Sequence, residues 1–196
     1  MATKKCLTLS SFVSDLKKTY NKDYFKANRL CYGEIDHDDK KVKYIGTSFV
    51  LVRIPEQFEP YFDSDENILN LLGLRDVCTS IYRVNSNTTQ SIVGNEALTA
   101  ASPFTITIPL EEPSMFGKPV DSIIFSSDTT WAAFNKHYID VAKAIYPQDS
   151  IYLNSHSTGF FKYRSEDAPD AMVCGIKLQD KYKGKIAAMS SKISFA

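Results

Sequence analysis

KKVKYIGTSFVLVRIPEQF, residues 40–58, is a hydrophobic segment that is interrupted by the small polar residues Gly46-Thr47-Ser48 and stopped by Pro55. Apolar and polar side chains alternate along it, and a period of two residues is typical of strands with one buried face. Glycine and small hydroxyl residues favour a tight turn or a bulge. We therefore predict a pair of sheet strands that are joined at residues 46–48.

The acidic cluster Asp36-His37-Asp38-Asp39 precedes these strands. Clustered carboxylates supply oxygen ligands for a hard cation such as calcium. The cluster lacks the glycine and the terminal glutamate of a calcium-binding loop, and it lies where a hairpin has to turn. A solvated turn is therefore the prediction, and we expect no metal ion there.

An amphipathic pattern lies close to the start of the chain, directly after Ser10-Ser11. The apolar residues that share one helical face are Phe12, Val13, Leu16 and Tyr20. The basic residues on the far side are Lys17, Lys18 and Lys22. The pattern predicts a short amphipathic helix with a basic outer face.

The middle of the chain is less regular. The apolar residues Ile68, Leu69, Leu71 and Leu72 predict a short helix that Gly73 closes, after an acidic loop. Residues 80–84 (SIYRV) and 104–110 (FTITIPL) resemble strands. Residues 85–103 between them are mostly polar and are predicted to form a loop.

The last third of the chain repeats the opening pattern. A strand, DSIIFSS, precedes a helix that is predicted over residues 131–146 and ends before Pro147. The polar face of this helix carries Lys136, His137, Asp140 and Lys143. Strand-length runs follow, so a helix followed by three strands is expected at both ends of the chain, as a repeat of architecture and not of residues.

Composition limits the classes of function. Of 196 residues, 43% are hydrophobic, which suffices for a buried core. Lys plus Arg and Asp plus Glu each number 23, so any nucleic-acid contact has to come from a local basic face. No apolar run approaches the roughly 20 residues of a membrane-spanning helix, and the first residues lack the apolar core of a signal peptide. We expect a cytoplasmic protein with reduced cysteines and no membrane contact.

The sequence contains no catalytic signature. Its histidines, His37, His137 and His156, lie far apart, and no serine or cysteine stands in a recognisable nucleophile motif. The glycines form no phosphate-binding loop, and the cysteines have no zinc-ligand spacing. The chain is therefore expected to be no enzyme and to hold no cofactor. A hydrolase whose residues meet only in the folded chain is the weakest alternative.

Two segments carry a resemblance to a known family. YIGTSFVLVRIP, residues 44–55, combines a strand, a small turn and an apolar strand with a basic residue, and residues 134–178 combine a helix, strands, an acidic turn and a last strand. Both resemble modules of the DNA sliding clamp family, which includes the beta subunit of bacterial replicative polymerase, and more closely the shortened clamp-like proteins of phages. Thr47-Ser48-Phe49 replaces the Thr-Asp-Gly of that family, and Cys174-Gly175 replaces its Met-Pro.

The resemblance implies a module of two helix-plus-sheet units, with helices that face DNA and sheets outside. It also implies protein partners that dock short peptides in a hydrophobic groove. A chain of this length corresponds to about one module, so encircling DNA would require several copies.

We therefore predict an α+β protein with antiparallel sheets and two main helices, resembling one sliding-clamp module. Residues 1–196 are expected to form a single domain built of two helix-plus-strands units, about 8–60 and about 120–180, with a middle insertion at about 61–119.

The expected function is that of a non-enzymatic, clamp-like interaction protein in DNA replication or phage biology, in the cytoplasm of a bacterial host cell. The expected partners are a polymerase or another replication factor, double-stranded DNA and further copies of the chain. The expected DNA-backbone contacts are Lys17, Lys18, Lys22, Lys136 and Lys143. The alternative is a phage protein that binds and inhibits a host or defence factor and has no DNA role.

Overall fold

The fold was analysed in a computed structural model, which describes residues 7–20, 30–76, 80–84, 99–104, 109–110, 120–126, 131–147, 151–153, 158–161 and 168–176. The helices are α1 (Leu9–Lys17), the 3-10 helix η2 (Glu56–Phe62), α2 (Asp65–Leu72) and α4 (Lys136–Ile145). The strands are β1 (Leu30–His37), β2 (Lys40–Thr47), β3 (Val50–Arg53), β4 (Tyr82–Val84), β5 (Thr99–Phe104), β6 (Pro109–Leu110), β7 (Val120–Ser126), β8 (Trp131–Asn135), β9 (Ile151–Leu153), β10 (Thr158–Phe161) and β11 (Ala171–Cys174).

The strands form one continuous sheet in the order β4-β1-β2-β3-β11-β10-β9-β5-β7-β6, and β8 pairs with β7. Neighbouring strands are antiparallel, except that β1 and β4 are parallel. Helices combined with a largely antiparallel sheet give an α+β arrangement. This confirms the fold class that the sequence predicts.

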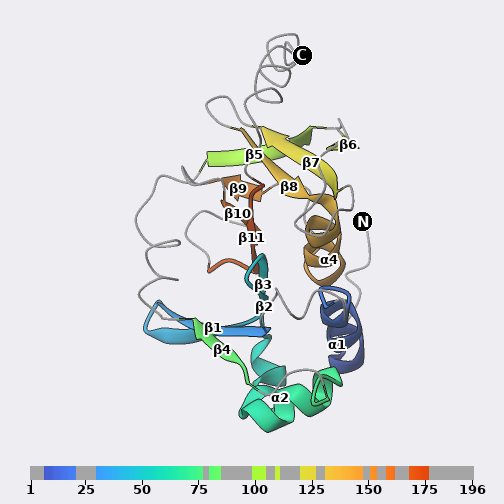
Figure 1. Cartoon of the computed structure of the whole chain (residues 1–196). Coiled ribbons are helices and arrows are strands. Elements are labelled where there is room, and N and C mark those ends of the chain that lie inside the picture. Colours follow the sequence, from blue (N-terminus) through green and yellow to red (C-terminus); the bar gives the residue numbers. More distant parts are fainter. Residues whose placement is uncertain are drawn as a thin grey trace.

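Two runs of antiparallel strands meet in the middle of the sheet (Figure 1). The first run is β1, β2 and β3, which α1 precedes, and the second is β9, β10 and β11, which α4 precedes. β3 pairs with β11 through Val50↔Val173, Leu51↔Met172 and Val52↔Ala171. Segments more than a hundred residues apart in the chain therefore lie side by side.

The main hydrophobic core lies between this sheet and the helices. Val50 and Val52 of β3 belong to one buried cluster with residues of α1, α2 and α4, whereas Leu51 packs with Tyr44 and Met172 in a second cluster. Successive side chains of a strand point to opposite faces of the sheet. The helices therefore cover one face, and the smaller second cluster lies on the other.

Helix α1 begins slightly earlier than the sequence indicates. Thr8 is the N-cap: its hydroxyl accepts a hydrogen bond from the backbone N–H of Ser11 at 3.1 Å, and the Ser11 hydroxyl accepts one from the N–H of Thr8 at 3.0 Å. This reciprocal capping satisfies donors that a helix start otherwise leaves without partners. The buried residues of the helix are Phe12, Val13 and Leu16, as its apolar pattern predicts.

The prediction of one helix over residues 131–146 is wrong in its first part. Trp131 to Asn135 form β8, whose five residues pair antiparallel with β7. Asn135 then caps α4, because its side-chain oxygen accepts a hydrogen bond from the backbone N–H of His137 at 2.9 Å. Pairing with a neighbouring strand, which the local sequence does not reveal, determines the structure of this segment.

One prediction for the middle of the chain is also corrected. Residues 99–103, predicted as part of a loop, belong to β5, which pairs with β9 and β7. Residues 56–62, for which the sequence predicts no element, form η2, whose Phe58 and Phe62 pack against Phe12 with ring centroids 5.8 and 5.9 Å apart. By contrast, α2 ends at Gly73 in the left-handed conformation, with φ at 66°, as predicted.

The acidic cluster at residues 36–39 forms the hairpin turn that the sequence predicts. His37 pairs with Lys40, so Asp38 and Asp39 form a two-residue connection between β1 and β2. Both have positive φ, 49° and 59°, which is typical of a type I′ turn. Aspartate tolerates this conformation better than most residues, but glycine adopts it with less strain.

We expect Asp39→Gly to raise the free energy of unfolding by about 0.5–1 kcal/mol, because glycine removes the Cβ strain at the second turn position. Urea unfolding measures this change. Asp39→Ala is the matched control, since it removes the same carboxylate but keeps Cβ, and we expect it to lower the stability. Equal effects of the two substitutions would contradict the turn geometry.

Candidate nucleic-acid interface

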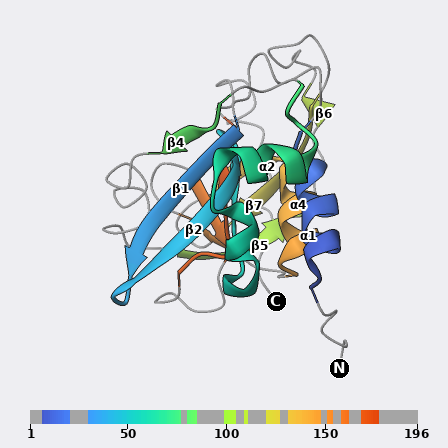
Figure 2. The same ribbon diagram turned by 90° about the horizontal axis from the view of Figure 1, so that it is seen from below.

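Helices α1 and α4 lie next to each other and run in opposite directions (Figure 2). His137, in the first turn of α4, places its Nε2 atom 2.7 Å from the carbonyl oxygen of Lys18, the C-cap residue of α1. Because a carbonyl oxygen only accepts, Nε2 carries the hydrogen and donates. The end of α1 is thereby attached to the start of α4.

The structure brings the predicted lysines to this helix pair, except Lys22, which lies outside the described residues. Lys17 and Lys18 are exposed at the end of α1. Lys136 is the first residue of α4, and Lys143 lies in its last turn. At a helical rise of 1.5 Å per residue, the two are about 10 Å apart along the same face. The two neighbouring helices therefore carry four cations, of which Lys17 lies on the side of α1 that faces α2.

Two of these cations are partly neutralised by aspartates of their own helix. The Lys18 ammonium lies 2.5 Å from Asp15, and Lys136 forms an ion pair with Asp140. Within the described ranges, no carboxylate lies within 4.0 Å of Lys17 or Lys143. Four lysines and two aspartates leave the pair with a formal excess of two positive charges.

The turn between β2 and β3 packs against α4. Phe49 stacks on Tyr138 of α4, with ring centroids 5.8 Å apart and planes within 10° of parallel. Buried Thr47 fixes the turn, since its hydroxyl accepts hydrogen bonds from the N–H groups of Phe49 and Val50 at 3.2 and 3.4 Å. A Cβ at Gly46 would lie 2.0 Å from the Val50 carbonyl oxygen, so only glycine fits.

The far end of α4 rests on a polar cluster at the β3–β11 junction. The Tyr146 hydroxyl donates to the carbonyl oxygen of Arg53 at 2.7 Å, and the Arg53 guanidinium forms an ion pair with buried Asp170. On the opposite face of the sheet, the Tyr44 hydroxyl donates to the carbonyl oxygen of Pro169 at 2.8 Å. These contacts join α4, β3 and the segment before β11.

Burial determines the ionisation of this cluster. It raises the pKa of both Tyr44 and Tyr146, whose phenols are therefore neutral donors at physiological pH. For Arg53, burial is the largest influence and would lower the pKa, but Asp170, Tyr146 and Tyr44 together outweigh it and the pKa is raised. The cluster thus contains one fixed ion pair and two neutral hydroxyl donors.

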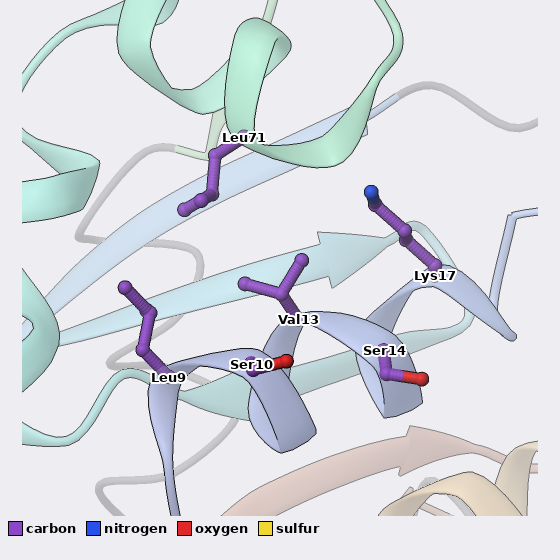
Figure 3. A pocket seen from close by; sticks show the side chains of 6 residues that line it. All are labelled: Leu9, Ser10, Val13, Ser14, Lys17 and Leu71. Atoms are coloured by element: carbon purple, nitrogen blue, oxygen red, sulfur yellow. The ribbon is translucent and has the colours of Figure 1, made fainter.

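A shallow groove of about 490 Å³ lies between α1 and α2. Leu9 and Val13 of α1 and Leu71 of α2 point into the same space, and Lys17 stands at one end (Figure 3). Ser10 and Ser14 complete the lining. The sequence analysis does not predict this groove. Its signal in the sequence is that Leu9 of α1 and Leu71 of α2 are apolar although they lie next to, and not on, the buried face of their helix.

The described residues with reactive side chains are dispersed. His137 lies on α4 and His37 at the β1–β2 hairpin, while His156 lies outside the described residues. The Cys174 thiol donates to the Ser48 carbonyl oxygen at 3.5 Å, and burial raises its pKa, which disfavours the thiolate that a nucleophile requires. In the part of the chain that the structure describes, no group of three metal-ligating side chains occurs.

Comparison with known proteins found no matching family model, no matching curated protein and no matching solved structure. Among the described helices, none is long and apolar enough to cross a membrane.

The contribution of the Arg53–Asp170 ion pair to stability can be measured. We expect Arg53→Met to lower the free energy of unfolding by about 3 kcal/mol, because it removes the cation beside a buried carboxylate. Arg53→Lys is the matched control: it keeps the charge, so its loss should be smaller. Chemical denaturation measures both, and a loss below about 0.5 kcal/mol for Arg53→Met would mean that solvent screens the pair.

Proposed function

We propose that this chain is a non-enzymatic, clamp-like interaction protein that acts in DNA replication or phage biology, in the cytoplasm of a bacterial host cell. Its α1–α4 face, defined by Lys17, Lys18, Lys136 and Lys143, contacts the DNA backbone. The observation that supports this proposal is that two helices from opposite ends of the chain lie together and carry these cations. Lysines on a helical face suit phosphates without reading bases.

The charge of this face sets the expected strength of binding. Four phosphate contacts per chain give a slope of log K against log salt of about −3.6, so one chain binds weakly at physiological salt. Several copies on one DNA add their contacts. The proposal therefore includes a homo-oligomer, together with a polymerase or another replication factor that is recruited to it.

Charge reversal tests the DNA contact. We expect the double variant Lys17→Glu, Lys143→Glu to lower the affinity for a short duplex by roughly tenfold or more at low salt, because it replaces two attractions by repulsions. The matched control is Lys40→Glu, Lys41→Glu, which makes the same charge change at exposed residues of the β1–β2 hairpin. Fluorescence anisotropy over a salt series measures the affinity, and light scattering of the same samples measures association.

Equal losses in the two double variants would mean that only the total charge of the protein matters. The absence of salt-dependent binding by the parent protein would exclude the DNA contact.

The second candidate function is binding and inhibition of a host or defence factor without a DNA role. The groove between α1 and α2 favours it, because apolar walls of leucine and valine suit a protein side chain better than a phosphate backbone. Lys17 at the end of the groove suits an acidic neighbour of that side chain.

We expect Leu71→Glu to remove capture of a specific host protein, because it places a charge on the apolar wall of the groove. Affinity capture from host lysate, followed by direct binding of the purified partner, measures this. Asn70→Glu, at an exposed position of the same helix, is the control. Unchanged capture by Leu71→Glu would exclude the groove as the contact.

A further inference from the structure

The groove between α1 and α2 has apolar walls. Leu9 and Val13 of α1 and Leu71 of α2 point into it (Figure 3). Leu9 and Leu71 are only half-buried, so part of each side chain still faces the groove, whereas Val13 is buried. A volume of about 490 Å³ is that of a small ligand site. The walls therefore suit an apolar side chain that an occupant supplies.

One end of the groove carries a cation. Within the described ranges, no carboxylate lies within 4.0 Å of the Lys17 ammonium. Its Nζ atom lies 3.8 Å from the point that a Cβ atom on Gly73 would occupy, which places the ammonium at the C-terminal end of α2. The last carbonyl groups of a helix carry a partial negative charge, which attracts a cation. The ammonium is therefore held at the groove and keeps a net positive charge.

The carboxylates of α1 and α2 are engaged elsewhere. Each of them forms an ion pair with another basic residue, and the pairs are Asp15–Lys18, Glu66–Arg75 and Asp65–Arg83. Among the described residues that line the groove, Lys17 alone is charged. A carboxylate that an occupant brings is therefore the electrostatic complement of this end of the groove.

The spacing of residues along α1 fits an extended peptide. Leu9, Val13 and Lys17 lie four residues apart, and Ser10 and Ser14 repeat this interval beside them. Four residues of helix rise about 6 Å, and side chains on one side of an extended chain repeat at about 6.6 Å. An apolar side chain that packs on Val13 thus brings a carboxylate two residues later to Lys17. The two serine hydroxyls, which can donate and accept, have the spacing of alternate backbone groups of such a peptide.

We propose that the α1–α2 groove binds an extended segment of a partner protein in which an apolar side chain is followed, two residues later, by an acidic side chain that pairs with Lys17. The groove is shallow, so the segment can continue past both ends and needs no free terminus. The inference rests on the second candidate function and deepens it, because it states the chemistry that the partner presents. A phosphate backbone offers no apolar group to Leu9 and Leu71 and is the poorer occupant.

The test uses the full chain and three synthetic peptides: N-acetyl-Leu-Ser-Glu-amide, N-acetyl-Leu-Ser-Gln-amide and N-acetyl-Leu-Glu-Ser-amide. NMR titration of the isotope-labelled protein measures each dissociation constant, down to millimolar affinity. We expect the first peptide to bind roughly two- to fivefold more tightly than the others, because the second lacks the carboxylate and the third directs it to the opposite side. Lys17→Met should remove this preference. Lys18→Met, at the neighbouring exposed lysine outside the groove lining, is the matched control and should keep it.

The outcomes distinguish the inference from the function on which it rests. Equal affinities of the three peptides, no binding of any of them, or a preference that survives Lys17→Met would overturn the inference and leave the second candidate function intact. Self-association of the parent chain that Leu71→Glu abolishes, measured by light scattering, would assign the groove to a second copy and would also overturn the inference. Host-protein capture that Leu71→Glu leaves unchanged would overturn both.

Discussion

The pairing of β3 with β11 is the contact on which the rest of the structure depends. It joins residues near the start of the chain to residues near its end, so both runs of strands and both helices are placed relative to each other by this one ladder. Backbone hydrogen bonds extend it in both directions, from Arg53 N–H to the Asp170 carbonyl at 2.8 Å and from Cys174 N–H to the Phe49 carbonyl at 2.8 Å. Closing so long a loop costs only slightly more entropy than closing a shorter one, but it makes folding slow.

The Arg53–Asp170 ion pair contributes more to the register of this ladder than to its stability. A buried pair recovers little beyond the cost of removing both charges from water. A slip of one residue, however, would turn Val50 and Val52 away from the main core and would separate the two charges. Tyr146 ties α4 to the same arginine, so the register of the strands also determines where the basic helix lies.

The sequence correctly predicts structural features that depend on interactions between residues close together in the chain. The alternation that predicts β2 and β3, the turn at Asp38-Asp39 and the glycine that ends α2 are each set by neighbours a few residues away. The structure agrees with them, except that the β2–β3 turn lies at Ser48-Phe49 and not at residues 46–48. Residues 131–135 are the exception, because they form a hairpin with the preceding strand β7, in which Ser126 pairs with Trp131, although their apolar pattern predicts a helix. This pairing is local, so the error comes from the ambiguity of a short apolar run between helix and strand. Long-range pairing explains a different error: β5, predicted as loop, pairs with β9 much later in the chain.

In the candidate interface, too, the sequence predicts the locally determined features but not the contacts between distant residues. The amphipathic patterns identify the lysines, and their pairing with Asp15 and Asp140 follows from spacings of three and four residues along a helix. No periodicity indicates that His137 meets the carbonyl group of Lys18, 119 residues away, or that α1 and α2 enclose a groove. Such contacts depend on how the helices pack on the sheet, and that in turn depends on the β3–β11 register.

The small excess of positive charge on the α1–α4 face affects how this face would act on DNA. Exposed ion pairs contribute little to stability, so a phosphate can compete with Asp15 or Asp140 for its lysine at small cost. Under the proposed function, a single chain would exchange rapidly between neighbouring phosphates and hold none of them tightly. Retention on DNA would then come from the number of faces that act together, since the salt slopes of linked copies add. A small excess of positive charge on the helix pair would therefore be better suited to mobile contact than to fixed binding.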